Sequence, residues 1–200
     1  IKNLDNTMIP TFKDYINRKA DIALVPGSFK PPHKGHYEMV KQYSQMADNV
    51  VVLISAPSAK SERKTKTGQV ITPEISKKLF ELYVSNLPNV DVDISPLPSP
   101  VGAAYNALES LSGKRVILGS SLKDDDWKRW SGVQKWATGK SLNVDIIDPK
   151  TSAVSVVDKP DGTPYSASNI RDNFDNLDVI MDDIPDHIDP DIVKSILSAS

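Results

Sequence analysis

Two short polar motifs contain the residues best suited to chemistry. The first is His33-Lys34-Gly35-His36, and the second, near the other end of the chain, is Ser166-Ala167-Ser168-Asn169-Ile170-Arg171. Imidazole, ammonium and guanidinium groups are donors that can stabilise negative charge on phosphate oxygens. Serine hydroxyls at a helix start add neutral donors, together with free backbone N–H groups. The two motifs therefore predict a phosphate-binding site.

The residues around the first motif predict how it is held in place. An apolar run, Ile22-Ala23-Leu24-Val25, is typical of a buried strand, and Pro26-Gly27 interrupts it as a turn would. Apolar residues then recur at helical spacing over residues 37–43. A strand that turns directly into a helix is the first half of a βαβ unit, in which ligands lie beside the helix N-terminus. We therefore expect both histidines at the carboxyl end of a strand.

The rest of the chain alternates between strand and helix patterns, for which a right-handed crossover between parallel strands is the default. We predict an α/β fold, a Rossmann-like doubly wound parallel sheet with helices on both faces. Residues 1–20 are interpreted as an N-terminal extension with a short helix, and residues 21–200 as a single domain. Further strands are predicted over residues 49–55, 90–94, 115–121, 144–148 and 153–157, and further helices over 72–83, 101–111, 122–136, 166–177 and the end of 184–197.

The composition is that of an ordinary globular chain, with 39% hydrophobic and 25% charged residues among 200. The net charge of −2 disfavours a general nucleic-acid binder. No apolar run is long enough to span a membrane, and no signal peptide is visible. The absence of cysteine excludes disulfides and thiolate metal sites. These features favour a cytoplasmic protein without a membrane partner.

A cationic loop follows the second predicted strand. Lys60, Arg63, Lys64 and Lys66 fall within seven positions, on the side of the sheet where the first motif is expected. Such a run of charges is most often a solvated, mobile loop. Its position beside the first motif instead favours a lid that closes on phosphates. Both interpretations stay open, and a third, nucleic-acid binding, depends on this loop alone.

Both motifs resemble those of a known superfamily. Residues 27–36, GSFKPPHKGH, resemble the signature G-[ST]-F-D-P-x-[HT]-x-G-H of the HxGH nucleotidyltransferases, and residues 166–171 match their second motif, [ST]-x-[ST]-x-[IL]-[RK]. The resemblance covers nearly the whole chain and is closest to phosphopantetheine and nicotinamide-nucleotide adenylyltransferases. It implies the HUP-type nucleotidyltransferase fold. Residues 11–16 also resemble the openings of some tailed-phage proteins, which would place the chain in a host cytoplasm.

The resemblance implies a reaction as well as a fold. Members of the superfamily move a nucleotidyl group from a nucleoside triphosphate to an acceptor oxygen and release pyrophosphate. The implied substrates are ATP and a phosphorylated acceptor. Mg²⁺ would arrive with the triphosphate, because magnesium prefers phosphates and water to an all-protein cage. Relatives are commonly oligomers, so a homo-oligomer is implied as an option.

The resemblance also assigns roles to individual residues. His33 and His36 would contact the triphosphate. Lys30 or Lys34 would neutralise further charge, and Arg171 would hold the β- and γ-phosphates. The other expected nucleotide-binding residues are Gly27, Ser28, Phe29, Gly35, Gly119, Ser120, Ser121, Tyr165, Ser166, Ser168 and Ile170, and the phosphate or lid residues of the loop are Lys60, Arg63 and Lys64.

The chain departs from the superfamily pattern at particular positions. Lys30 stands where Asp is usual, and His33 stands where phosphopantetheine enzymes carry Thr. The Arg that precedes the second motif in cytidylyltransferases is missing, which favours ATP over CTP. Two alternatives stay open. One is a non-catalytic structural or nucleotide-binding protein that keeps the fold, and the other is zinc at the two histidines, for which no third ligand stands nearby.

Overall fold

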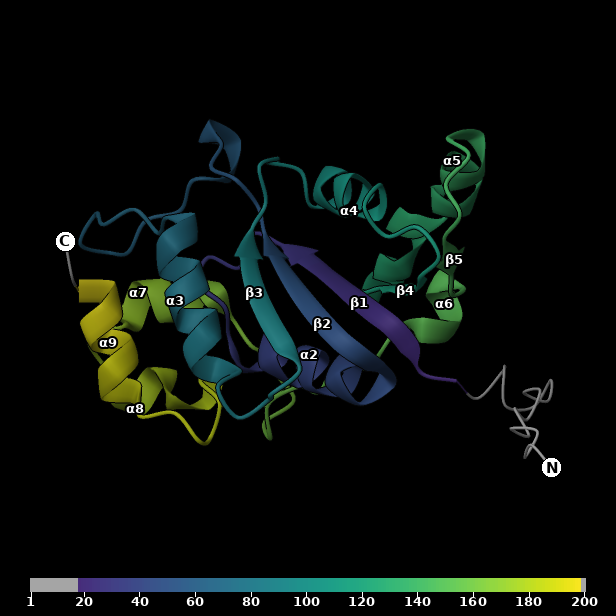
Figure 1. Cartoon of the computed structure of the whole chain (residues 1–200). Helices are drawn as coiled ribbons and strands as arrows, with labels where there is room; N and C mark the ends of the chain where they lie inside the picture. The colour runs from purple at the N-terminus through teal and green to yellow at the C-terminus, as the bar shows by residue number, and fades with distance from the viewer. Residues whose placement is uncertain (1–17, 199–200) are drawn as a thin grey trace, which may run out of the picture.

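Five parallel strands form one sheet within residues 18–198, the part of the chain that the computed structural model describes. The order is β3-β2-β1-β4-β5, and all neighbours run parallel. The chain winds from β1 through β2 and β3 in one direction and through β4 and β5 in the other (Figure 1). This confirms the predicted doubly wound sheet, whose switch point lies between β1 and β4. The strands are β1 (Ala20–Gly27), β2 (Ala47–Ile54), β3 (Val90–Ile94), β4 (Arg115–Leu118) and β5 (Asp145–Ile146).

Helices cover both faces of the sheet because successive side chains of a strand point to opposite faces. In β1, Ala23 and Val25 belong to a buried cluster with residues of α2, α3 and α9. Leu24 belongs to a second cluster, with residues of α4 and α5 (Figure 1). The helices are α2 (Lys34–Met46), α3 (Pro73–Tyr83), α4 (Pro100–Leu108), α5 (Val133–Gly139), α6 (Pro149–Ser152), α7 (Ala167–Asn173), α8 (Leu177–Ile180) and α9 (Pro190–Ser198), with 3₁₀ turns η1 (Ala59–Ser61), η2 (Lys123–Trp130) and η3 (Met181–Asp183).

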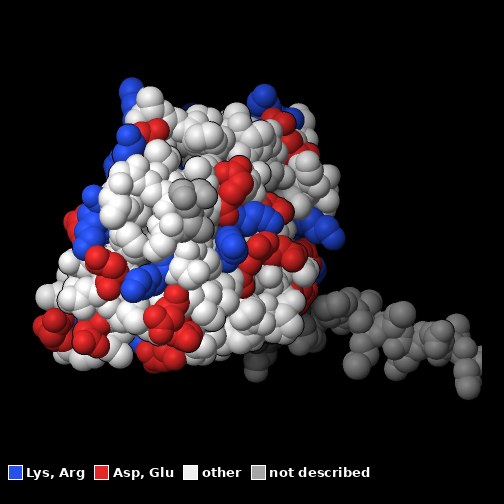
Figure 2. All heavy atoms as spheres, turned by 90° about the vertical axis from the view of Figure 1, so that its left-hand side faces the viewer, with Lys and Arg blue, Asp and Glu red and all other residues white. Residues whose placement is uncertain are grey.

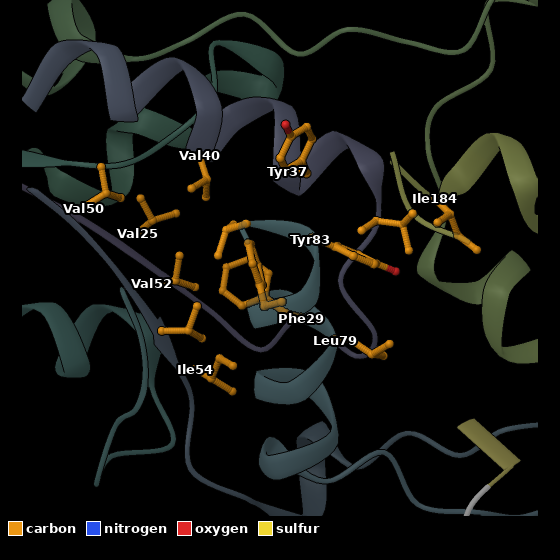
Figure 3. Close-up of a cluster of buried hydrophobic side chains, with 14 of the residues drawn as sticks. Val25, Phe29, Tyr37, Val40, Val50, Val52, Ile54, Leu79, Tyr83 and Ile184 are labelled. Carbon is orange, nitrogen blue, oxygen red and sulfur yellow. The ribbon is translucent and has the colours of Figure 1, made fainter. Parts of the chain in front are cut away.

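The larger buried cluster extends into the first motif through Phe29, which Figure 3 shows among the buried side chains of the sheet and α3. The Phe29 ring meets Phe80 and His36 edge-on, with 4.9 Å between ring centroids in each case. Phe29 has a φ of 48°, a left-handed conformation that few residues other than glycine adopt. Such a conformation persists where the surrounding packing determines it. The hydrophobic core therefore fixes the turn that follows β1.

The single helix predicted over residues 122–136 is wrong, because the segment forms η2 and then α5. Within η2, Asp124 and Asp125 both have a φ of 54°. Aspartate favours turns and local side-chain hydrogen bonds over the interior of a helix, and three aspartates are consecutive here. After this break Trp130 is fully buried, and its indole N–H donates to the carbonyl of Gly119 at 3.2 Å.

Two other predicted boundaries also need correction. The strand predicted over residues 153–157 does not form: Val154 makes one isolated parallel bridge to Ser121, and Val156 and Val157 are exposed. The helix predicted over residues 166–177 ends at Asn173, and α8 begins separately. The remaining predicted strands form, although β4 ends at Leu118 and β5 consists of Asp145–Ile146 alone. The helices α2, α3, α4 and α9 are confirmed. The predicted N-terminal helix lies outside the described residues.

Within residues 18–198, no helix combines the length and the apolar composition that crossing a bilayer requires.

Candidate active site

A cavity of about 340 Å³, here called the first cavity, opens where β1 ends and α2 begins. This is the position at which doubly wound sheets bind ligands, beside the switch point. Its walls come from the first motif, from the end of β4 with η2, and from the segment before the second motif. Eight of the predicted site residues line it, namely Gly27, Ser28, Phe29, His33, Gly35, His36, Ser121 and Tyr165.

The two histidines of the first motif cap helix α2 with their own side chains. The Nδ1 atom of His33 accepts the backbone N–H of His36 at 3.4 Å, and the Nδ1 atom of His36 accepts the backbone N–H of His33 at 3.2 Å. This is a capping box in which imidazoles replace the usual hydroxyl and carboxylate. The two rings stack with 3.6 Å between centroids. Residues that the sequence marks for chemistry therefore also begin the helix.

The capping geometry determines which ring nitrogen is free. Because each Nδ1 accepts a hydrogen bond, the pattern assigns the proton of each neutral ring to Nε2. Neither Nε2 has a hydrogen-bond partner among the described residues, and both rings line the first cavity. Burial lowers the pKa of His33 to about 4, and burial together with the neighbouring ring of His33 lowers the pKa of His36 well below its usual value. Two neutral N–H donors thus face a prospective ligand.

The lowered pKa of His33 predicts a pH-dependent stability. Between pH 6.5 and about 4 the unfolded chain binds a proton that the folded chain excludes, so the free energy of unfolding falls as pH drops through this window. His33→Asn keeps an acceptor for the cap and removes the titration. We expect a shallower fall for this variant in urea unfolding at pH 7, 5.5 and 4.5. The two slopes of unfolding free energy against pH should differ by a fraction of about 1.4 kcal/mol per pH unit, since the ring is half-buried. Parallel curves for the variant and the unmodified chain would contradict this.

Two glycines of the first motif leave room for aromatic rings. A Cβ atom at Gly35 would lie 2.9 Å from Cε1 of His33 and 3.2 Å from Cδ2 of Tyr165. A Cβ atom at Gly27 would lie 2.7 Å from the ring of Phe29. Real Cβ atoms essentially never come closer than 3.0 Å to another heavy atom, so any side chain at either position would displace the ring of His33 or of Phe29. The glycines thereby set the positions of His33 and Phe29.

The second motif begins helix α7 and contacts the first motif directly. Ser166 is the N-cap, and its hydroxyl accepts the backbone N–H of Asn169 at 3.0 Å. The guanidinium of Arg171 donates to the carbonyl of Lys30 at 2.6 Å and to the hydroxyl of Ser168 at 3.1 Å. Two of its five N–H donors are used in these bonds, so three remain. Arg171 therefore joins the two motifs and keeps donors for an anion.

A buried carboxylate that the sequence analysis missed supports the second motif. Asp183 is fully buried and accepts the backbone N–H of Ser166 at 2.8 Å and the side-chain amide of Asn169 at 2.7 Å. Its other partner is the ammonium of Lys159 at 3.0 Å. Burial lowers the pKa of His33, and the negative charge of Asp183 partly offsets this by raising it. Because Asp183 lies in an acidic stretch of ordinary appearance, no motif in the sequence marked it.

Charged residues of η2 also line the first cavity and were not predicted. Arg129 donates to the carbonyl of Gly119 at 2.9 Å and lies 3.6 Å from the carboxylate of Asp126. Asp126 accepts the backbone N–H of Ser121, and Lys123 lies on the same wall. These residues reach the cavity because the helical conformation is interrupted at Asp124 and Asp125. A prediction of one continuous helix could not place them there.

Several predicted site residues lie elsewhere in the fold. The ammonium of Lys34 pairs with Asp186 at 2.8 Å, and Lys30 donates to Ser61. The side chain of Ile170 lies in the core. The backbone groups of Gly119 and Ser120 bond to β1, to the hydroxyl of Tyr43 and to the side chains of η2. None of these five residues is part of the lining of the first cavity.

The cationic loop is tied to the second motif. The backbone N–H of Lys66 donates to the carbonyl of Arg171 at 3.1 Å, and its ammonium pairs with Asp175 at 2.5 Å. Arg63 donates to carbonyls of its own loop, and Lys64 lies 3.5 Å from the carboxylate of Glu62. Lys60 is exposed. The phosphate or lid role of Lys60, Arg63 and Lys64 stays a prediction.

The distribution of charge on one face bears on possible partners. Figure 2 shows the side of the molecule that carries α3 and α9, where Lys and Arg are interspersed with Asp and Glu. Nucleic-acid binding requires a continuous basic area that follows the phosphate backbone. On the face shown, the mixed charges do not form one.

The described residues offer few ligands for a metal ion. Among residues 18–198, no group of three or more His, Cys, Asp or Glu side chains could hold a metal ion. Asp126 is a single carboxylate on the wall of the first cavity. Magnesium typically takes one or two carboxylates together with substrate phosphates and water. The residues present fit an ion of that kind and offer no zinc cage.

The sheet, the histidine pair at its switch point and the second motif define a nucleotidyltransferase-type site. Over residues 24–173 the chain matches the Cytidylyltransferase-like family. The chain belongs to this family, which confirms the predicted superfamily.

Individual relatives agree with this assignment. The chain is similar to a phosphopantetheine adenylyltransferase of Leuconostoc citreum, with 40% identity over 153 residues, which cover 76% of this chain and 82% of that enzyme. It is also similar to the phosphopantetheine adenylyltransferase of Aquifex aeolicus, with 40% identity over 67 residues, although that match covers only 34% of this chain and 37% of the relative. These relatives confirm the prediction of a nucleotidyltransferase enzyme.

A solved structure shares the fold. A bifunctional NMN adenylyltransferase/ADP ribose pyrophosphatase from Francisella tularensis superposes with a TM-score of 0.53 and 13% identity, over 90% of this chain and 51% of that chain. The identity is low, so the likeness supports the architecture of the sheet and helices alone.

Proposed function

We propose that the chain transfers AMP from ATP to a phosphate oxygen of a small acceptor, with release of pyrophosphate. The observation that carries this proposal is the pair of free Nε2–H donors, on His33 and His36, beside the N-terminus of α2 in the first cavity. The relatives named phosphopantetheine adenylyltransferase support ATP as the donor and a phosphate monoester as the acceptor.

The proposed chemistry needs positioned donors more than a reactive side chain. An oxygen of the acceptor phosphate attacks the α-phosphorus in line, and the bond from the α-phosphorus to the oxygen that bridges to the β-phosphate breaks. Pyrophosphate leaves with that electron pair, and an ionised acceptor phosphate needs no general base. Charge grows on the oxygens around the α-phosphorus, where N–H donors stabilise it most. His33 and His36 supply such donors without carrying a charge themselves.

Further positive charge in this proposal comes from Arg171 and Arg129. Arg171 retains free N–H donors between the two motifs, and Arg129 lies on the wall of the first cavity. Bound with the triphosphate, Mg²⁺ would supply additional charge neutralisation, with Asp126 as the carboxylate available to hold it. Lys34 is already paired with Asp186, so its proposed contribution is smaller.

The first test measures pyrophosphate release with ATP, CTP, GTP and UTP in the presence of Mg²⁺. Each triphosphate is combined with phosphopantetheine, nicotinamide mononucleotide, flavin mononucleotide, phosphocholine and glycerol phosphate. We expect release only with ATP and with one of the phosphate monoesters. ATP binding without release across the panel would favour the alternative, a nucleotide-binding protein that keeps the fold. Absence of both release and nucleotide binding would overturn the proposal.

A further inference from the structure

The hydroxyl of Tyr43 joins three elements that surround the first cavity. Tyr43 lies in α2, about two helical turns after His36, and its side chain is fully buried. Its hydroxyl oxygen accepts the backbone N–H of Ser120 at 3.0 Å. Its one proton can be donated to either of two carbonyl groups, that of Ser120 at 2.8 Å or that of Ser152 at 2.9 Å. Since Ser120 follows β4 and Ser152 ends α6, one oxygen atom connects the helix of the histidine pair with both elements.

The segment after β4 is the first wall that this hydroxyl holds. The backbone N–H groups of residues 119–122 all donate to protein groups. Their acceptors, in chain order, are the carbonyl of Leu24, the hydroxyl of Tyr43, the carboxylate of Asp126 and the carbonyl of Val154. The hydroxyl is the one acceptor among these four that belongs to α2. Ser121 lies within the segment and lines the first cavity, so the bond to Tyr43 fixes this wall relative to the histidine pair.

The segment after α6 is the second wall that this hydroxyl holds. The chain runs from Ser152 to Val156, which lines the first cavity. Gln42, the residue before Tyr43, donates its side-chain amide to the carbonyl of Ser155 at 3.0 Å. Two adjacent residues of α2 therefore hold this segment, one at each end.

The ring of Tyr43 fits closely beside residue 119. A Cβ atom at Gly119 would lie 3.2 Å from Cε2 of Tyr43 and 3.0 Å from the carbonyl oxygen of Leu24, and both distances are shorter than ordinary van der Waals contact. Burial raises the pKa of Tyr43 to about 12, so the hydroxyl keeps its proton at neutral pH. The O–H donor is therefore available throughout the range in which activity would be measured.

We infer that Tyr43 is a positioning residue for the nucleotide, because its hydroxyl keeps the walls that begin at Ser120 and Ser152 in place to receive ATP. Tyr43 is not part of the lining of the first cavity, so it acts through these two walls. The histidine pair is held separately, by its capping box and by the packing of Phe29. Loss of the hydroxyl should therefore weaken the binding of ATP more than it slows the chemical step. This inference depends on the proposed function.

The first experiment uses Tyr43→Phe, which keeps the ring and removes the hydroxyl, in steady-state pyrophosphate release. We expect the KM for ATP to rise about fivefold to tenfold, because a buried hydrogen bond to the walls is lost. The kcat and the KM for the acceptor should stay within about twofold. Tyr37→Phe is the matched control, because Tyr37 is a buried tyrosine of the same helix whose hydroxyl bonds to Asn86, and it does not line the first cavity. An unchanged KM for ATP in Tyr43→Phe, or an equal rise in Tyr37→Phe, would mean that Tyr43 only supports the fold, and would overturn the inference.

The second experiment measures hydrogen exchange, which needs no turnover. In Tyr43→Phe we expect the amides of residues 119–122 and 152–156 to exchange about fivefold to tenfold faster, while the amides of α3 keep their rates. Gln42→Met removes the donor to Ser155 from a partly exposed position, so it tests the second wall without a change in the core. This variant should raise the exchange rate over residues 152–156 alone, and it should raise the KM for ATP as well. Unchanged exchange of both segments in Tyr43→Phe would contradict the inference.

The outcomes separate this inference from the proposed function. An active chain whose KM for ATP is the same with and without the hydroxyl of Tyr43 refutes the positioning role alone. A chain that neither binds ATP nor releases pyrophosphate refutes the proposed function, and the assignment of the two walls to a nucleotide fails with it.

Discussion

Replacing His36 with asparagine is expected to lower kcat by about 10²- to 10³-fold while helix α2 still forms. The asparagine oxygen can take the place of Nδ1 and accept the backbone N–H of His33, so the cap survives. The Nε2–H donor on the wall of the first cavity is lost. His36→Ala removes both functions, so it should show the same loss of kcat and an additional loss of about 1 kcal/mol in the free energy of unfolding. The two variants thereby separate catalysis from capping.

The measurement is steady-state pyrophosphate release, combined with urea unfolding of each variant. His187→Asn is the matched control, because this histidine bonds to the carbonyl of Tyr83, packs on Tyr37 and is not part of the lining of the first cavity. It should keep the kcat of the unmodified chain. A His36→Asn variant that retained more than about a tenth of the original kcat would show that this imidazole is not a transition-state donor.

Asp183→Ala is expected to destabilise the fold by about 3–5 kcal/mol, because it breaks a buried ion pair and leaves the other partner unpaired. The substitution leaves the ammonium of Lys159 without its ion-pair partner. It also removes the acceptor for the backbone N–H of Ser166 and for the side chain of Asn169. That is a large part of the 5–15 kcal/mol by which ordinary domains are stable. Since Ser166 caps α7, the N-terminal end of α7, where we propose that the triphosphate binds, should loosen as well, and the KM for ATP should rise.

Urea unfolding and ATP kinetics measure these two effects. Asp182→Ala changes the neighbouring, exposed carboxylate and should alter neither. The double variant Asp183→Leu with Lys159→Met removes both charges, so it should recover part of the stability without restoring the KM. A loss below about 1 kcal/mol in Asp183→Ala would contradict the role assigned to this carboxylate.

The parts of the fold that the sequence predicted well are those in which local pattern and burial agree. The run at residues 22–25 has apolar side chains for both faces of the sheet, and it became the central strand. The helix predicted over residues 72–83 forms as α3 from Pro73 to Tyr83, with Thr72 as its N-cap. The histidine pair was placed correctly beyond a strand end, although the turn predicted at Pro26 and Gly27 is wrong. Both residues still pair within β1, and the left-handed residue of the turn is Phe29.

The failures have physical reasons of their own. The prediction of one helix over residues 122–136 overlooked the turn preference of three adjacent aspartates. The run at residues 153–157 has the side chains of a strand but no layer to cover Val156 and Val157. Asp183 bonds to Ser166, 17 residues away in the chain, and Arg129 bonds to Gly119, 10 residues away, so both contacts lie beyond the spacing of a single helix or strand. Such contacts follow from tertiary packing and leave no local pattern.

The hydrogen bond from Arg171 to the carbonyl of Lys30 has a consequence for the synthesis of this protein. The two partners are separated by 141 residues, so the bond closes most of the chain into one loop. The ribosome synthesises the first motif early, and this motif lacks its contact with Arg171 until residue 171 has emerged. At about 5–20 residues per second this interval lasts on the order of ten seconds. Under the proposed function, a nascent chain that retains ATP would therefore be one in which α7 has reached the first motif, and ATP retention could serve as a probe of this step of co-translational folding.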